Sequence, residues 1–298
     1  MVNMEKKKGQ GIRRGMDEKV FRVLSGALIL LFSVACLLPF LRVVSEAVSG
    51  DTAVASGEIL ILPKDFTLKQ LKFILDTPQF TQGMWVSLSS TVVYTVISIV
   101  LTCMLAYPLS RTDLPGRRGL MFYVVFTMLF NGGMVPTYLV VKNLGILNTF
   151  WALIIPLAIS QFNVIVLVNG FLGIPKEMEE SALIDGAGQF TILVRIMVPL
   201  AKPTLAAILL FYAVARWNGW FDAVMYVNDR SLFPLPVIIK DLVQQGLNTS
   251  MFPSLTTPPP TQAIRSAAVI FSIVPIILVY PFLQKYFVKG VTLGGVKG

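Results

Sequence analysis

Long apolar runs recur along almost the whole sequence, and few charged residues interrupt them. A helix needs about 20 mostly apolar residues to cross a hydrocarbon core about 30 Å thick, because each residue adds about 1.5 Å. We predict membrane spans at residues 23–43, 83–109, 119–141, 150–172, 203–227 and 265–284. The expected fold is therefore all-α: a polytopic membrane protein whose six transmembrane helices form one domain, residues 23–288.

The overall composition agrees with a membrane protein. Of 298 residues, 55% are hydrophobic and 14% charged, which leaves too little polar surface to cover a water-soluble globule of this size. The net charge of +9 is scattered between apolar runs rather than gathered in one patch, so we expect contact with membrane lipid and no nucleic-acid partner. The sequence contains no histidine, the commonest metal ligand of proteins, and we expect no metal site. We also expect this chain to bind no cofactor of its own.

Lys and Arg are unevenly divided between the two sides of the predicted spans. The two ends of the chain, the turn after residue 109 and the segment 175–202 together hold sixteen, and the alternate connections hold seven. Loops with the excess of positive charge face the cytoplasm. We therefore expect the basic segment 1–22, the loop 175–202 and the tail 289–298 to be cytoplasmic.

The cytoplasmic loop 175–202 has the pattern of two short helices joined by a turn. Pro175 and the three glutamates that follow it favour a helix start, where the helix dipole is positive. Gly186 and Gly188 permit a sharp stop, and a second short helix can run up to Pro199. On the residues alone, an amphipathic loop that merely joins two spans explains this pattern as well.

The spacing within this loop resembles that of a known family. Glu180, Ser181 and Ala182 are followed by Gly186 and then, after nine residues, by the segment 196–199, Ile-Met-Val-Pro. This is similar to the EAA loop of binding-protein-dependent ABC importer permeases, in which Glu-Ala-Ala precedes Gly and Ile-x-Leu-Pro. Serine replaces one alanine here, and valine replaces the leucine. The resemblance implies a type I ABC importer permease fold in a bacterial cytoplasmic membrane.

The resemblance also implies a role for the loop and a set of partners. In that family the loop forms a coupling helix that docks into a cleft of the ATP-hydrolysing subunit. The residues expected to seat it are Glu180, Ser181, Ala182, Asp185, Gly186, Ile196 and Pro199. The implied partners are two ATPase subunits, a second homologous permease chain and an extracellular solute-binding protein. The sequence has no Gly-x-x-x-x-Gly-Lys-Ser/Thr phosphate loop, so we expect ATP and Mg²⁺ on the partner subunits and no enzyme activity here.

Three further stretches narrow the resemblance to the carbohydrate branch of these permeases. Residues 131–138 and 142–149, together with the ending 284–298, are similar to the subgroup that imports oligosaccharides and uronate-containing saccharides. The implied substrate is a saccharide, and the resemblance leaves its identity open.

Polar groups inside the predicted spans are the candidates for the substrate path, because such groups are costly in a membrane and usually face the bundle interior. They are Asn131, Gln161, Asn163, Arg216, Trp217, Asn218, Trp220 and Asp222. Each has a structural alternative, since intramembrane amides also bond neighbouring helices and aromatic residues also form the interface belt. Arg216 would suit an acidic sugar.

Three other functions stay open as alternatives. An ABC permease for a non-sugar solute would share the loop. An ion-coupled secondary transporter would place charges near the membrane midplane, and this chain has few there. A membrane enzyme would need clustered acid, base or metal ligands, and the predicted spans lack a convergent carboxylate pair.

Overall fold

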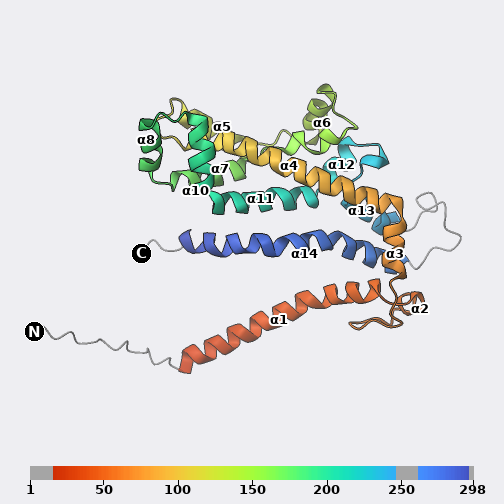
Figure 1. The fold of residues 1–298 in the computed structure, drawn as a ribbon. Helices are drawn as coiled ribbons and strands as arrows, with labels where there is room; N and C mark the ends of the chain where they lie inside the picture. The colour runs from red at the N-terminus through yellow and green to blue at the C-terminus, as the bar shows by residue number, and fades with distance from the viewer. Residues whose placement is uncertain (1–15, 246–260, 295–298) are drawn as a thin grey trace, which may run out of the picture.

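Three continuous helices are each long and apolar enough to cross a membrane. They are α1 (Met16–Ala47), α4 (Pro78–Ser110) and α14 (Thr261–Gly294), and their axes are roughly aligned, with α1 running opposite to α4 and α14 (Figure 1). The computed structural model describes residues 16–245 and 261–294, so residues 1–15 of the basic segment and 295–298 of the tail lie outside the described residues. Helix and no strand occurs in the described part of the chain, as the sequence predicts.

Three further apolar segments are bent rather than straight. The pair α5 (Arg117–Leu129) and α6 (Met134–Asn143) meets at 113°. The short 3₁₀ helices η1 (Phe150–Leu153) and η2 (Ile155–Leu157) meet α7 (Gln161–Leu172) at 54°. The segment Gln189–Leu200 meets α11 (Lys202–Trp217) at 86°. If each bent pair counts as one crossing, the number of spans reaches six, by length and composition.

Three predicted spans, 119–141, 150–172 and 203–227, are thus interrupted, although the sequence predicts a continuous helix in each. In the segment 119–141 the helix stops at Leu129, and Gly133 takes a φ of +92°, a backbone conformation that favours glycine. The Asn131 side-chain oxygen accepts a hydrogen bond from the Gly133 N–H at 2.9 Å, which satisfies the backbone at the break. In the segment 203–227, α11 ends at Trp217 and α12 (Phe221–Tyr226) begins after the break.

Helix α4 is the centre of the packing, because α7 and α11 both lie against it. The Tyr212 hydroxyl of α11 is 2.7 Å from the Thr102 hydroxyl of α4 and accepts from the Ser160 N–H at 3.1 Å, just before α7. The Tyr94 hydroxyl of α4 donates to the Leu157 carbonyl at 2.8 Å. These buried polar contacts tie three helices together without leaving their hydroxyls unpaired.

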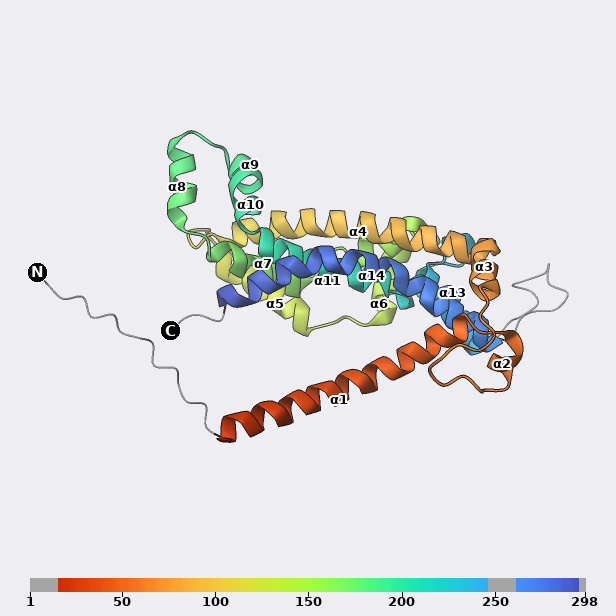
Figure 2. The same cartoon turned by 60° about the horizontal axis from the view of Figure 1, so that its bottom comes forward.

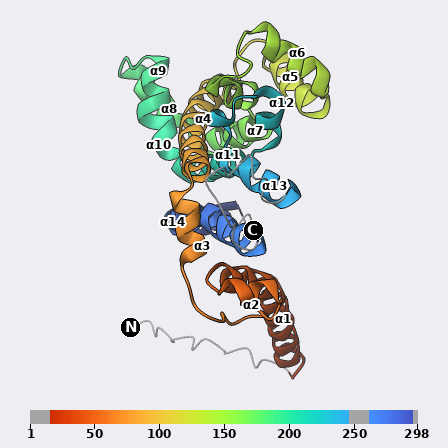
Figure 3. The ribbon, with the colours of Figure 1, turned by 90° about the vertical axis from the view of Figure 1, so that its right-hand side faces the viewer.

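Helix α1 stands apart from this bundle and touches it mainly near one end. Figures 2 and 3 show α14 between α1 and the group of α4, α7 and α11. Near the end of α1, Glu46 accepts hydrogen bonds from Gln262 at 3.0 Å and from Ser266 at 2.8 Å, both on α14. Most apolar side chains of α1 are exposed. The helix is therefore held to α14 by a buried polar contact and by packing at one end.

The same end of the bundle carries the smaller helices. These are α2 (Asp51–Ala55), α3 (Lys69–Asp76), η4 (Arg230–Leu232) and α13 (Leu235–Gln245). The Asn148 side-chain oxygen accepts from the backbone N–H groups of Asn228 and Asp229, which joins the loop before η1 to the loop after α12. Asp229 in turn caps η4, and the hydrogen bond from the Ser231 N–H lowers the pKa of this carboxyl.

Close contact between α7 and α11 depends on Gly170. A Cβ at this position would lie 2.9 Å from Cγ2 and 3.0 Å from Oγ1 of Thr204. We expect Gly170→Ala to lower the free energy of unfolding by about 1–3 kcal/mol through overpacking, measured by thermal unfolding in detergent. Gly173→Ala is the control, since its nearest neighbour is 3.5 Å away. Adding Thr204→Ala to Gly170→Ala should recover part of the loss, and no recovery would contradict this explanation.

Candidate functional site

Helix α8 (Lys176–Ile184) lies at the end of the structure opposite α3 and α13 and stands out from the long helices (Figures 1 and 2). Pro175 directly precedes it, and Glu177 and Glu179 lie in its first turn, where the helix dipole favours negative charge. The start of α1 and the end of α14 lie at this same end (Figure 1). The sequence predicts a helix that starts at Pro175 and stops near Gly186, and α8 lies within these limits.

The stop of α8 is a Schellman turn centred on Gly186. The Ala187 N–H donates to the Ala182 carbonyl at 2.9 Å, and the Gly186 N–H donates to the Leu183 carbonyl at 3.0 Å. Gly186 has a φ of +78°, and Asp185 is the last residue before it, in the cap position. No atom lies within 4 Å of where a Cβ would stand at Gly186, so the need for glycine comes from the backbone conformation alone.

The two faces of α8 differ in their exposure to solvent. Glu177, Glu180, Ser181 and Ile184 follow the helical spacing of one face, and all are exposed, Ile184 to 87%. Ala182 lies on the opposite face, buried in the main apolar cluster with Ala187 packed against that cluster. One face is thus fixed to the chain's own core while the other, with Glu180 and Ser181, is open.

The second arm of the loop begins with α9 (Gln189–Ile192) and ends with α10 (Val198–Leu200), joined by a π-helical turn, η3 (Leu193–Met197). Pro199 has no N–H, and its ring would crowd the carbonyl four residues earlier in a regular α-helix. The wider π turn directly before it absorbs that conflict. Ile196 and Pro199 are both half-buried, and Ile196 packs against the main apolar cluster.

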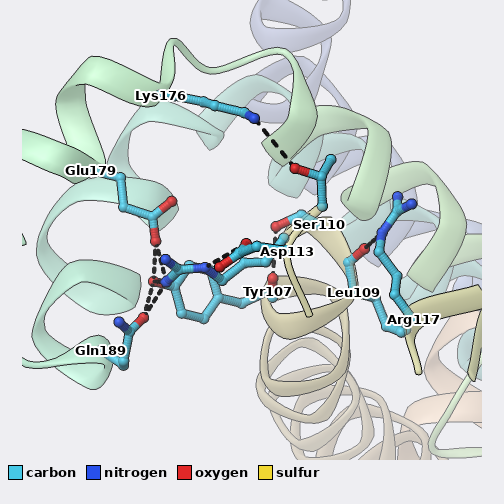
Figure 4. A network of polar contacts seen from close by, with 10 residues as sticks. Tyr107, Leu109, Ser110, Asp113, Arg117, Lys176, Glu179 and Gln189 are labelled. Atoms are coloured by element: carbon cyan, nitrogen blue, oxygen red, sulfur yellow. Dashed lines mark hydrogen bonds and ion pairs between the residues drawn. The ribbon is translucent and has the colours of Figure 1, made fainter. Parts of the chain in front are cut away.

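A polar network that the sequence did not suggest ties α8 to the end of α4 (Figure 4). An Arg111 guanidinium nitrogen lies 2.6 Å from the Glu179 carboxylate and donates to the Gln189 side-chain oxygen at 2.5 Å. The Tyr107 hydroxyl lies 2.7 Å from each of those two oxygens. We call Tyr107, Arg111, Glu179 and Gln189 the inner network. In the sequence Arg111 counted only toward the charge bias and Glu179 toward the helix start, so long-range pairing left no local signal.

Arg216 and Asp222, predicted for the substrate path, form a buried ion pair across the break between α11 and α12. Arg216 is 3% exposed, and it also donates to the carbonyl oxygens of Leu153 at 2.8 Å and Gly219 at 3.2 Å. The pair joins α11, α12 and η1. The guanidinium therefore has protein partners in this structure.

The other predicted path residues are spread over several places. Trp220 lies beside the same break with the Lys240 ammonium 3.6 Å from its ring centre. Asn218 is exposed and donates to the Val214 carbonyl at 3.0 Å. Gln161 and the buried Asn163 lie in the first turn of α7, while Asn131 stays at the break between α5 and α6. The structure therefore brings together the group around α11 and α12, and the three amides lie elsewhere.

An apolar cavity of about 420 Å³ between α4, α11 and α14 includes one further predicted residue, Trp217. Thr91 and Thr95 also line it, and their buried hydroxyls, like that of Ser98, lack a hydrogen-bond partner among the described residues. These hydroxyls were not among the path residues predicted from the sequence. Their helical spacing on one face of α4 was the available signal.

Comparison with known proteins agrees with this arrangement. The family model described as binding-protein-dependent transport system inner membrane component matches residues 82–293. The chain is 43% identical to the polygalacturonan/rhamnogalacturonan transport system permease protein YtcP of Bacillus subtilis (strain 168), over 95% of this chain and all of that protein. It is also 43% identical to protein LplC of the same organism, over 88% of this chain and 90% of that protein.

A solved structure extends the likeness to three dimensions. A crystal structure of a bacterial ABC transporter involved in the import of the acidic polysaccharide alginate matches with a TM-score of 0.83 and 33% identity, over 92% of this chain and 98% of that chain. The resemblance inferred from the loop and the predicted all-α permease fold are thereby confirmed. The chain therefore belongs to the family of binding-protein-dependent transport system inner membrane components.

Proposed function

We propose that this chain is the permease subunit of an ATP-driven importer for saccharides, acidic oligosaccharides foremost, in a bacterial cytoplasmic membrane. Members of its family are permease subunits and not enzymes, and the ATPase is a separate subunit. ATP and Mg²⁺ are then used by two partner subunits, and a solute-binding protein outside the cell delivers the saccharide. A second, homologous permease chain completes the translocation path.

The observation that carries this proposal is the open face of α8. The loop that matches the family motif stands out at the end of the bundle, with Glu180, Ser181 and Ile184 exposed and Ala182 anchored to the core. A helix fixed on one side and open on the other is suited to docking into a cleft of a partner. Acidic side chains on its open face can accept hydrogen bonds from basic or backbone groups there.

The charge bias and the helix directions support a cytoplasmic location for α8. The start of α1 and the end of α14 lie at the same end as α8, and the sequence places the larger share of Lys and Arg on that side. This orientation puts both termini in the cytoplasm and leaves the loop helices α2, α3 and α13 outside, where a binding protein can reach them.

The acidic saccharide is supported by the relatives. YtcP is named for polygalacturonan and rhamnogalacturonan transport, and the matching crystal structure belongs to an alginate importer. Asn131, Gln161, Asn163, Trp217, Asn218 and Trp220 remain the proposed path residues. A direct contact of Arg216 with an acidic sugar requires that its pair with Asp222 opens during transport, which makes this contact specific to one transport state.

We expect Ile184→Asp to weaken association with the ATPase subunits by about tenfold or more, because a charge would replace the most exposed apolar side chain of the docking face. Co-purification of the complex in detergent measures this. Leu62→Asp is the matched control: Leu62 is 78% exposed but lies in the loop between α2 and α3 at the opposite end. Equal losses for both variants would contradict docking through α8.

Uptake into proteoliposomes that contain the complete transporter tests the substrate. We expect labelled oligogalacturonides to enter with ATP and the binding protein, in preference to neutral malto-oligosaccharides of equal length. Preference for the neutral sugars would refute the acidic substrate, and uptake of a non-sugar solute alone would assign the chain to another branch. Uptake driven by an ion gradient without ATP would refute the importer itself.

A further inference from the structure

Helix α8 is connected to the spans by few contacts apart from its two chain ends. Its buried Ala182 reaches the core, but the polar side-chain contacts from α8 to other helices, among the described residues, run to the end of α4 and the turn after it. A cavity of about 270 Å³ is lined by Arg111 and by Lys176, Glu179, Glu180 and Leu183, so α8 is not packed on this side. A displacement of α8 is therefore passed first to α4.

The inner network links α8 to the end of α4 through contacts that are partly shielded from water. The side chains of Arg111 and Glu179 are 22% and 17% exposed, so their ion pair is better shielded from water than a surface pair. Gln189, from the second arm of the loop, accepts a hydrogen bond from the same arginine nitrogen, and the Tyr107 hydroxyl is hydrogen-bonded to the Glu179 and Gln189 oxygens (Figure 4). Both arms of the loop thus converge on one helix end.

Helix α4 can carry a displacement onward. It is a single helix of 33 residues, about 50 Å long, and its Thr102 hydroxyl is hydrogen-bonded to the Tyr212 hydroxyl of α11. Tyr212 in turn accepts a hydrogen bond from the Ser160 N–H directly before α7. We propose that Arg111 is a positioning residue whose pair with Glu179 transmits movement of α8 to the inner end of α4. The proposal rests on the proposed function, because the movement is expected to come from the ATPase subunits.

Complete transporter complexes with Arg111→Gln, Glu179→Gln or both test this role. We define the transport ratio as the number of oligogalacturonide molecules moved per ATP hydrolysed. We expect each single variant to retain its ATPase subunits and to have a transport ratio at least about fivefold lower than that of the unaltered complex. The double variant should be no worse than either single one, because both remove the same link. Arg111→Lys, which keeps the charge, should recover part of the ratio.

Arg118→Gln is the matched control. Arg118 is exposed, and its substitution removes the same charge on the same side of the predicted membrane. It should leave the ratio unchanged. Unchanged ratios in Arg111→Gln and Glu179→Gln would overturn the proposal. Multiplying losses in the double variant, or loss of the ATPase subunits from both single variants, would overturn it too.

A second measurement separates this inference from the proposed substrate. Spin labels at the exposed positions Leu105 on α4 and Val279 on α14 measure the distance between the inner end of α4 and α14. This distance is compared before and after the complex is trapped with ATP and vanadate. We expect the distance change seen in the otherwise unaltered complex to shrink by half or more in Arg111→Gln. This result holds even if oligogalacturonides are not moved, whereas an equal distance change in both complexes would overturn the inference.

Discussion

Gly186→Val should abolish most of the association between this permease and its ATPase subunits. A non-glycine residue in the left-handed region costs about 1–2 kcal/mol, and a β-branched side chain costs more, so the Schellman turn that ends α8 would unwind. The open face of α8 would then lose its fixed direction. Since about 1.4 kcal/mol corresponds to a tenfold change, co-purification should weaken by tenfold or more, and uptake should fall with it.

Two further substitutions separate backbone conformation from simple bulk. Gly188→Val makes the same change two residues later, where the backbone is extended and no atom lies within 4 Å, so we expect a small effect. Gly186→Asn adds bulk but tolerates the left-handed conformation, and it should be milder than Gly186→Val. If all three variants lose the ATPase subunits equally, contact with the partner and not the turn explains the requirement.

Arg216→Met and Asp222→Asn should each lower the free energy of unfolding by about 3–5 kcal/mol, because removal of one charge leaves the other charge buried without an opposite charge to compensate it. Thermal unfolding of the purified chain in detergent measures this. The double variant Arg216→Met with Asp222→Leu should be more stable than either single variant, since it removes both polar groups. Arg230→Met, at an exposed position on η4, should change little.

The same variants decide between the two roles of Arg216. A structural role predicts that stability falls and that the saccharide preference of any remaining transport is unchanged. A role restricted to the substrate predicts the reverse: Arg216→Met unfolds normally while the preference for acidic saccharides disappears. That second pattern would contradict the stability loss expected from the buried pair.

The sequence predicted those features that depend on composition or on local spacing. Long apolar runs need no knowledge of neighbours, and the turn at Gly186 follows from one residue's backbone freedom. The break at residues 130–133 was harder to predict, because two adjacent glycines in a mostly apolar run are as compatible with close helix packing as with a bend. Composition predicts which segments lie in the membrane, but it does not predict whether the helix in each segment is straight.

Contacts between distant residues could not be predicted in this way. Arg111 and Glu179 are far apart in sequence, and either charge is explained locally by topology or by the helix dipole. A charged residue inside a predicted span is costly, so Arg216 suggested a substrate contact. In the structure, Arg216 instead pairs with Asp222, six residues later and across a helix break. Seeing that partner required knowledge that the span stops at Trp217.

The π turn at Leu193–Met197 makes chain length, rather than residue identity, a requirement of the loop 175–202. Such a turn holds one residue more than a regular helical turn, and each residue of a helix rotates the chain by about 100°. Deleting a single residue there would restore a regular helix but swing Gln189, and α8 before it, away from Arg111. Substitutions along this arm are therefore far easier for the protein to accommodate than a change in the number of residues between Gly186 and Pro199.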